Sequence, residues 1–226
     1  MSTGHPKQQD IYYANPRPDV EPSIPRGARS ALDVGCSRGG FGATLRKTLG
    51  PQARLVGVEA VAAAAEEARA AGMFDEVVDG YFPDALAGRT EKFDAVFFND
   101  VLEHIVDPWQ VLLDVKDVLA PSGVVVAAIP NVQYLPVVVD LFKGQWVYTD
   151  EGILDRTHVR FFTRSTMVDM FEATGYEVID CRGANNSLSA WLAKDPKPWR
   201  RKAKTLVADR SGDRRFMHFV VTARPR

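Results

Sequence analysis

A glycine-rich loop with an acid on each side is the first feature of the sequence that could bind a ligand. Residues 32–42 read LDVGCSRGGFG, with Asp33 ahead of Gly35 and Gly39. Glycines let a backbone turn sharply or approach a ligand closely, and the helix expected next offers free N–H groups at its start. Glu59 follows the next apolar segment, 20 residues beyond Gly39, where a carboxylate can accept both hydroxyls of a ribose. The spacing therefore predicts a nucleoside-binding site.

The acid at position 33 narrows the choice of nucleoside. A carboxylate just before the glycines would repel the pyrophosphate of a dinucleotide at close range. It suits a ligand that carries an ammonium and a sulfonium and has no phosphate, as S-adenosylmethionine does. A nicotinamide-dependent dehydrogenase is the rival enzyme class, and Asp33 argues against it. The interpretation without a ligand is a packing turn with a solvated Asp33.

Two histidines are candidates for a general base, because imidazole accepts a proton near neutral pH. His104 follows the apolar segment 93–98, and His158 lies in GQWVYTDEGILDRTHVRFFT, residues 144–163. That string has more rings and charges than packing alone requires, and we expect it to bind a polyhydroxylated acceptor. His158 is the preferred base and His104 the second choice; otherwise both only structure their loops. The expected acceptor contacts are Trp146, Tyr148, Asp155 and Arg160.

Strands that alternate with helices must hold these residues in place. Strands are predicted at 30–34, 54–58, 76–78, 93–98, 124–129, 176–181 and 216–223. Helices are predicted at 41–49, 61–71, 107–119 and 163–174, the last two capped by Asp107 and Thr163. This order implies βαβ units and a parallel sheet, with the glycine loop at its first strand-to-helix turn. Residues 131–162 are expected to be irregular and aromatic.

Composition bounds the class of protein. The 226 residues include 28 Lys+Arg against 29 Asp+Glu, so the net charge of −1 argues against a protein that mainly coats nucleic acid or an anionic membrane. No apolar run approaches the ~20 residues of a membrane span, and the polar N-terminus lacks a signal core, so we expect a cytoplasmic location. The two cysteines and the acids show no clear ligand spacing, and we assign no metal.

Four segments carry a resemblance to a known family. They are LDVGCSRGGFG, LVGVE, FDAVFFNDVLEHIVDP and LAPSGVVVAAIPN. In order and spacing they resemble the motifs of class I S-adenosylmethionine-dependent methyltransferases over residues 28–183, in particular the small-molecule branch with ubiquinone-biosynthesis and sugar methyltransferases. The resemblance implies an α/β, Rossmann-like, doubly wound sheet of seven strands, mostly parallel with an antiparallel last strand. It also implies S-adenosyl-L-methionine as cofactor.

The matched positions imply cofactor contacts. Asp33 and the glycines match the residues that hold the methionine end, and Glu59 matches the ribose acid; Ser37 stands where the family usually has glycine. After the third strand, either Asp79 meets the adenine amino group or Tyr81 stacks on the base. The residues that end the fourth strand match the lining of the transfer site. The expected cofactor-binding set is Asp33, Gly35, Cys36, Gly39, Glu59, Asp79, Gly80, Tyr81, Asn99 and Asp100.

The expected organisation is an N-terminal arm or cap, 1–29, and a methyltransferase domain, 30–226, with an acceptor-binding insertion at 131–162. The segment 144–163 is also loosely similar to methyltransferases of bacterial cell-surface polysaccharide pathways. The basic run 194–204 is either a solvated linker or a docking patch for an anionic substrate.

The function predicted from these features is O-methylation of a small hydroxylated acceptor, a sugar or glycan-pathway intermediate. The alternatives are N- or C-methylation of another small metabolite and a non-catalytic interaction module. Nucleic acid is not an expected partner, because FFNDVLEH stands where a nucleic-acid methyltransferase would have Asn/Asp-Pro-Pro-aromatic. The acceptor could be anionic or a glycan, no integral membrane segment is expected, and a homodimer is compatible with the sequence.

Overall fold

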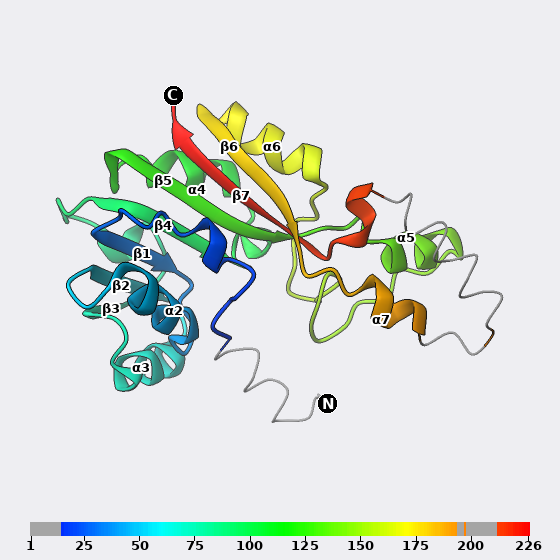
Figure 1. The fold of residues 1–226 in the computed structure, drawn as a ribbon, viewed down its shortest axis with the longest axis horizontal. Helices are drawn as coiled ribbons and strands as arrows, with labels where there is room; N and C mark the ends of the chain where they lie inside the picture. Colours follow the sequence, from blue (N-terminus) through cyan, green and yellow to red (C-terminus); the bar gives the residue numbers. More distant parts are fainter. Residues whose placement is uncertain (1–14, 194–196, 198–211) are drawn as a thin grey trace.

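A single seven-stranded sheet forms the centre of the computed structural model, which describes residues 15–193, 197 and 212–226 (Figure 1). The strand order is β3-β2-β1-β4-β5-β7-β6. Strands β1 to β5 pair in parallel, whereas β7 runs antiparallel between β5 and β6. This confirms the predicted α/β sheet with an antiparallel last strand. The strands are β1 Ser30–Val34, β2 Arg54–Glu59, β3 Glu76–Asp79, β4 Phe93–Asn99, β5 Leu119–Pro130, β6 Tyr176–Ala184 and β7 His218–Pro225.

The chain order of the strands creates a crevice next to β1. The chain adds β2 and then β3 on one side of β1 and returns to add β4 on the other side. Connections from β1 and β4 therefore leave in opposite directions at the carboxyl ends of the strands, which is where open α/β sheets bind ligands. The glycine-rich loop after β1 and the residues after β4 both lie at this switch point.

Helices connect most of the strands, and two of them begin where the sequence predicts. Asp107 caps α4 by accepting a hydrogen bond from the Gln110 amide at 3.1 Å, and Thr163 caps α6. The helices are α2 Gly40–Leu49, α3 Ala62–Ala71, α4 Pro108–Val115, α5 Leu135–Phe142, α6 Arg164–Ala173 and α7 Leu188–Ala193. Short 3-10 turns are η1 Glu21–Ser23, η2 Asp84–Leu86, η3 Leu102–His104 and η4 Gly212–Arg215.

Two sequence predictions of secondary structure are wrong. The predicted helix 107–119 ends at Val115, because Lys116–Val118 turn and Leu119 already begins β5. Residues 131–162 are not wholly irregular, because α5 lies within them. Its β-branched valines disfavour a helix locally. Burial of Leu135 in one apolar cluster with Leu188 and Leu192 of α7 favours it, and Figure 1 shows α5 and α7 together at one end of the molecule.

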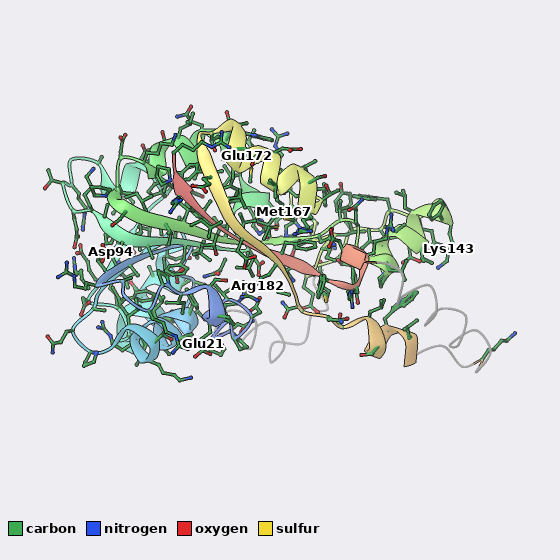
Figure 2. All side chains as sticks on the ribbon, turned by 45° about the horizontal axis from the view of Figure 1, so that its top comes forward. Glu21, Asp94, Lys143, Met167, Glu172 and Arg182 are labelled. Carbon is green, nitrogen blue, oxygen red and sulfur yellow. The ribbon has the colours of Figure 1, made fainter. Side chains whose placement is uncertain are left out.

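Apolar side chains fill both faces of the sheet (Figure 2). Neighbouring residues of β4 point to opposite faces, so Phe98 belongs to one core and Phe97 to the other. The segment before β1 covers part of the second face, where Val20 and Ile24 are buried. Arg182 of β6, labelled in Figure 2, donates a hydrogen bond to the Ser23 hydroxyl at 3.1 Å and binds this segment to the sheet.

Candidate functional site

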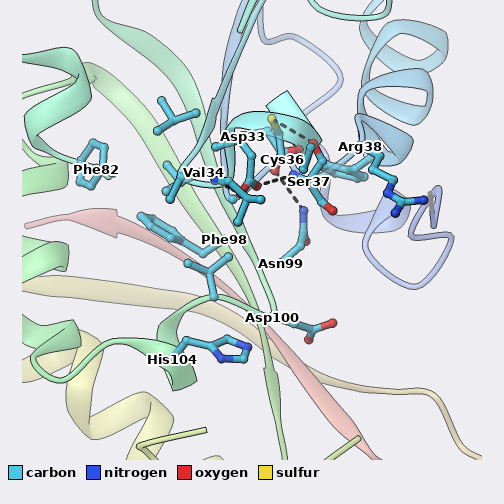
Figure 3. Close-up of a pocket in the computed structure, with 18 of the residues that line it drawn as sticks. Asp33, Val34, Cys36, Ser37, Arg38, Phe82, Phe98, Asn99, Asp100 and His104 are labelled. Atoms are coloured by element: carbon cyan, nitrogen blue, oxygen red, sulfur yellow. Dashed lines mark hydrogen bonds between the residues drawn. The ribbon is translucent and has the colours of Figure 1, made fainter. Parts of the chain in front are cut away.

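A cavity of about 530 Å³ lies at the crevice, and most of the predicted cofactor-binding residues line it (Figure 3). Gly39 and Asp79 do not line it. Asp79 instead forms an ion pair with Arg69, so of the two predicted adenine contacts only Tyr81 faces the cavity. The predicted cofactor residues along the cavity wall are Asp33, Gly35, Cys36, Glu59, Gly80, Tyr81, Asn99 and Asp100.

The backbone of the glycine-rich loop turns through left-handed conformations. Gly35, Ser37 and Gly39 have φ of 73°, 49° and 84°. A Cβ on Gly35 would lie 2.6 Å from Val101 Cγ2, so glycine is required there. Gly39 is the N-cap of α2, and a Cβ on it would lie 3.2 Å from the Cα of Ala68. The role of Gly39 is therefore to let α2 begin close against α3.

Glu59 joins the loop to the start of α3. Its Oε2 accepts a hydrogen bond from the Ser37 amide at 2.8 Å, and its Oε1 accepts one from the Val61 amide at 2.9 Å. The residue is buried, with 8% of its surface exposed. Two amide donors fix the carboxylate at the end of β2, and its remaining lone pairs are available to hydroxyl donors in the cavity.

Asp33 is a buried acid at the end of β1. Within the described part of the chain no cation forms an ion pair with it, and the Asn99 amide donates to its Oδ1 at 3.3 Å (Figure 3). Burial raises the pKa of Asp33 to about 7, although the Asn99 hydrogen bond and the charge of Arg17 oppose this. A ligand with a positive charge would stabilise the ionised form, because it replaces the lost hydration of the carboxylate.

Arg17 is a wall residue that the sequence reasoning missed. Its guanidinium lies 2.7 Å from Asp100 Oδ2 and 3.0 Å from Asp19 Oδ2, with 8% of its side chain exposed. Arg17 brings the N-terminal segment to the cavity, next to the end of β4. The position of Arg17 between two prolines gives no periodic signal, so only the long-range ion pair identifies it.

Of the two candidate bases, His104 lines the cavity and His158 does not. His104 Nδ1 lies 3.3 Å from the Thr157 carbonyl oxygen and 3.1 Å from Thr157 Oγ1. The Thr157 hydroxyl donates to Asp155 Oδ1 at 2.6 Å, and Thr157 and Asp155 also line the cavity. Burial, followed by the neighbouring His158, lowers the pKa of His104.

His158 lies behind His104. It is 7% exposed, its Nδ1 is 3.0 Å from the Ile153 carbonyl oxygen, and its ring meets that of His104 edge-on at 4.7 Å. Its Nε2 is 3.9 Å from Oε1 of Glu103. The backbone carbonyl of Glu103 accepts the amides of Val159 and Arg160 and so binds the predicted acceptor segment to η3.

The predicted acceptor contacts divide between the cavity and the surface outside it. Asp155 lines the cavity, whereas the rings of Trp146 and Tyr148 pack near Phe161, at centroid distances of 5.2 and 6.5 Å. Arg160 donates its Nε to the Val106 carbonyl at 2.9 Å and lies over the Trp109 ring. Three of the four predicted contacts therefore do not form part of the cavity wall.

Fold and site together define a nucleoside-dependent enzyme of the Rossmann-like class. Residues 12–180 match the methyltransferase domain family, and the chain belongs to that family. It is similar to the ubiquinone biosynthesis O-methyltransferases of Cereibacter sphaeroides (strain ATCC 17029), at 25% identity over 76% of this chain and 70% of the relative, and of Dinoroseobacter shibae, at 27% over 73% and 66%.

Solved structures share the fold at low identity. A SAM-dependent methyltransferase from Archaeoglobus fulgidus superposes with a TM-score of 0.68 at 16% identity, covering 97% of this chain and 99% of that one. The putative methyltransferase from Haloferax volcanii, solved with the activator Trm112, gives 0.66 at 18% identity over 96% and 92%. The protein is thus a methyltransferase whose cofactor is S-adenosylmethionine.

The residues present fit this cofactor. Glu59 can still accept hydrogen bonds from ribose hydroxyls. The buried carboxylate of Asp33 would attract a cationic group of the ligand and would repel a phosphate. No described helix has the length and apolar character that a membrane span requires. The basic run 194–204 lies outside the described residues except for Lys197.

Proposed function

We propose that the enzyme methylates a hydroxyl group of a small acceptor. The observation that carries this proposal is a supported imidazole on the cavity wall: His104, with Thr157 and Asp155 behind its Nδ1. Figure 3 draws His104 and Asp100 on the side of the cavity away from Ser37 and Arg38. The acceptor would therefore enter beside His104, with the cofactor held at the glycine-rich loop.

The cofactor supplies an electrophilic methyl on a sulfonium, so the chain must align a nucleophile and remove its proton. With Nδ1 donating to the Thr157 carbonyl, Nε2 of His104 keeps a lone pair. The lowered pKa of His104 keeps the ring neutral at pH 7 and ready to accept the hydroxyl proton. His104 thus replaces His158 as the proposed base, because His158 is buried away from the cavity.

The acceptor class is the finer part of the proposal. The sequence prediction of a sugar or glycan-pathway acceptor rested partly on Trp146 and Tyr148, which lie outside the cavity wall. Apolar side chains also line the cavity, namely Val101, Ile105, Val111, Phe82 and Phe98. Such a wall supports a hydroxylated aromatic acceptor as the second candidate. The curated relatives carry the name ubiquinone biosynthesis O-methyltransferase.

An acceptor screen tests the proposal. The purified protein is incubated with S-adenosylmethionine and two panels, nucleotide sugars and hydroxylated aromatics, and S-adenosylhomocysteine and the product mass are measured. We expect methylation in one panel, lost in His104→Ala at unchanged S-adenosylhomocysteine affinity. Products methylated only at nitrogen or carbon, as located by fragmentation, would contradict O-methylation. Cofactor binding without turnover on any acceptor would favour the non-catalytic module.

A further inference from the structure

We propose that Glu103, His104 and His158 bind one divalent transition-metal ion at the inner wall of the cavity. One ligand atom from each side chain can be chosen so that all lie within 4.8 Å of one another. The three residues come from two segments, η3 and the loop before α6, that only the fold brings together. This inference deepens the proposed function and rests on it, because the ion would bind the same acceptor hydroxyl.

The first argument is the environment of Glu103. Its side chain is fully buried, and neither carboxylate oxygen has a hydrogen-bond partner within the described part of the chain. An unpaired buried carboxylate is strongly disfavoured unless it is protonated or meets a cation. A bound ion would supply that cation.

The second argument is the distance between Glu103 and His158. Oε1 of Glu103 and Nε2 of His158 are 3.9 Å apart, which is too long for a hydrogen bond. Two ligands at the usual ~2.0–2.2 Å from one ion can stand this far apart. Because Nδ1 of His158 donates to the Ile153 carbonyl, its Nε2 presents a lone pair to the carboxylate. Two acceptors thus face one another across a gap that fits an ion.

The third argument is the support behind the imidazoles. A metal-bound histidine usually donates its second ring N–H to a carbonyl or carboxylate, which fixes the ring and the tautomer. Nδ1 of His158 meets the Ile153 carbonyl at 3.0 Å, and Nδ1 of His104 meets the Thr157 carbonyl at 3.3 Å. Both rings therefore have the arrangement that supports metal binding through Nε2.

The ligand set also indicates the kind of ion. Two imidazoles and one carboxylate favour Zn²⁺, Fe²⁺ or Co²⁺ over Mg²⁺ and Ca²⁺, which prefer oxygen ligands. His104 lines the cavity while the other two ligands are buried, so the open side of the ion would face the acceptor. With the ion bound, His104 is a ligand, and the hydroxyl proton passes to solvent because a bound cation lowers the pKa of that hydroxyl.

Metal binding is tested without relying on turnover. The tag-free, chelator-treated protein is titrated with Zn²⁺ and Mg²⁺ by calorimetry and with Co²⁺ by visible absorption, in the presence of S-adenosylhomocysteine. We expect one Zn²⁺ per chain, a Co²⁺ band typical of nitrogen ligands, and weak or absent Mg²⁺ binding. Glu103→Gln and His104→Ala should each lower the affinity for Zn²⁺ by about 10–100-fold or more, because changes to residues that only support the ligands already have effects of this size.

The control variant is Glu172→Gln, which removes a half-exposed carboxylate on α6 and should leave metal binding unchanged. Glu103 is buried, so Glu103→Gln can prevent folding for reasons unrelated to metal. His104 is exposed, and His104→Ala then still tests the site. Absence of Zn²⁺ and Co²⁺ binding, or equal binding in the wild type and both ligand variants, would overturn the metal site. Methyl transfer that persists in chelator would then leave the proposed function standing with His104 as a free base.

Discussion

The guanidinium of Arg17 lies 2.7 Å from the carboxylate of Asp100, although 83 residues separate them in the chain. The two side chains are 8% and 13% exposed, and Asp100 also lies 3.4 Å from His218 Nε2. This ion pair ties the N-terminal segment to the end of β4 and closes one edge of the cavity. The cofactor cavity is therefore built from the N-terminal segment as well as from the ends of the central strands.

Arg17→Met should destabilise the protein and weaken cofactor binding together. The change leaves Asp100 and Asp19 buried without their cation, and breaking a buried pair costs about 3–5 kcal/mol. Urea unfolding and calorimetry with S-adenosylhomocysteine measure the two effects. Lys47→Met is the control, because its ion pair with Glu21 is exposed and should change stability by less than about 0.5 kcal/mol. Equal stability of the two variants would contradict the role of the buried pair.

Glu59→Gln should weaken S-adenosylhomocysteine binding about 10–100-fold. The amide cannot accept hydrogen bonds through both of its terminal atoms, whereas Glu59 accepts from the Ser37 and Val61 amides while facing the cavity. A charged hydrogen bond of this kind contributes about 1.5–3 kcal/mol. Calorimetry measures the affinity, with Glu66→Gln on the exposed side of α3 as the matched control. An affinity like that of the control would remove Glu59 from the cofactor site.

The cofactor-free protein should lose stability between about pH 4 and pH 7 through Asp33. The folded pKa of about 7 exceeds the ordinary 3.8, so the folded state binds more protons than the unfolded state in this window. The free energy of unfolding therefore falls as the pH rises, by at most about 4 kcal/mol. Urea unfolding across this range measures the slope. Asp33→Asn should reduce it and leave a part of the same sign, because burial also raises the pKa of Glu103, whereas the exposed Asp169→Asn should keep the whole slope. A slope in Asp33→Asn as steep as that of the wild type would show that Asp33 does not contribute.

Thr157→Val should lower kcat and leave the KM for S-adenosylmethionine unchanged. The valine preserves shape but removes the hydroxyl that lies between His104 Nδ1 and Asp155 Oδ1. We expect a smaller loss than in His104→Ala, for which general-base loss predicts about 10²–10⁴-fold. Steady-state kinetics as a function of pH distinguish a residue that positions His104 from a merely structural one, because loss of a positioning contact shifts the pH profile of kcat. An unchanged kcat and pH profile in Thr157→Val would show that this hydroxyl does not position His104.

Features that depend on neighbouring residues could be predicted from the sequence. Asp107 and Thr163 begin helices because a capping side chain needs only the amides of the next turn. Asp33 and Glu59 end up on the same cavity wall because parallel strands present their carboxyl ends at one edge. Helix α5 could not be predicted in this way, because packing against α7 outweighs the local preference of its valines.

The sequence by itself determined the parallel sheet, the glycine-rich loop and the acids that flank it, since these follow from local periodicity and turn chemistry. Only the tertiary structure decided which histidine faces the cavity. His104 and His158 have the same chemistry, one at the end of the short turn η3 and one in a loop. Ile153 and Glu103 enclose the ring of His158, whereas His104 remains on the cavity wall. Such pairings join segments far apart in the chain, and no local pattern of residues specifies where two distant loops meet.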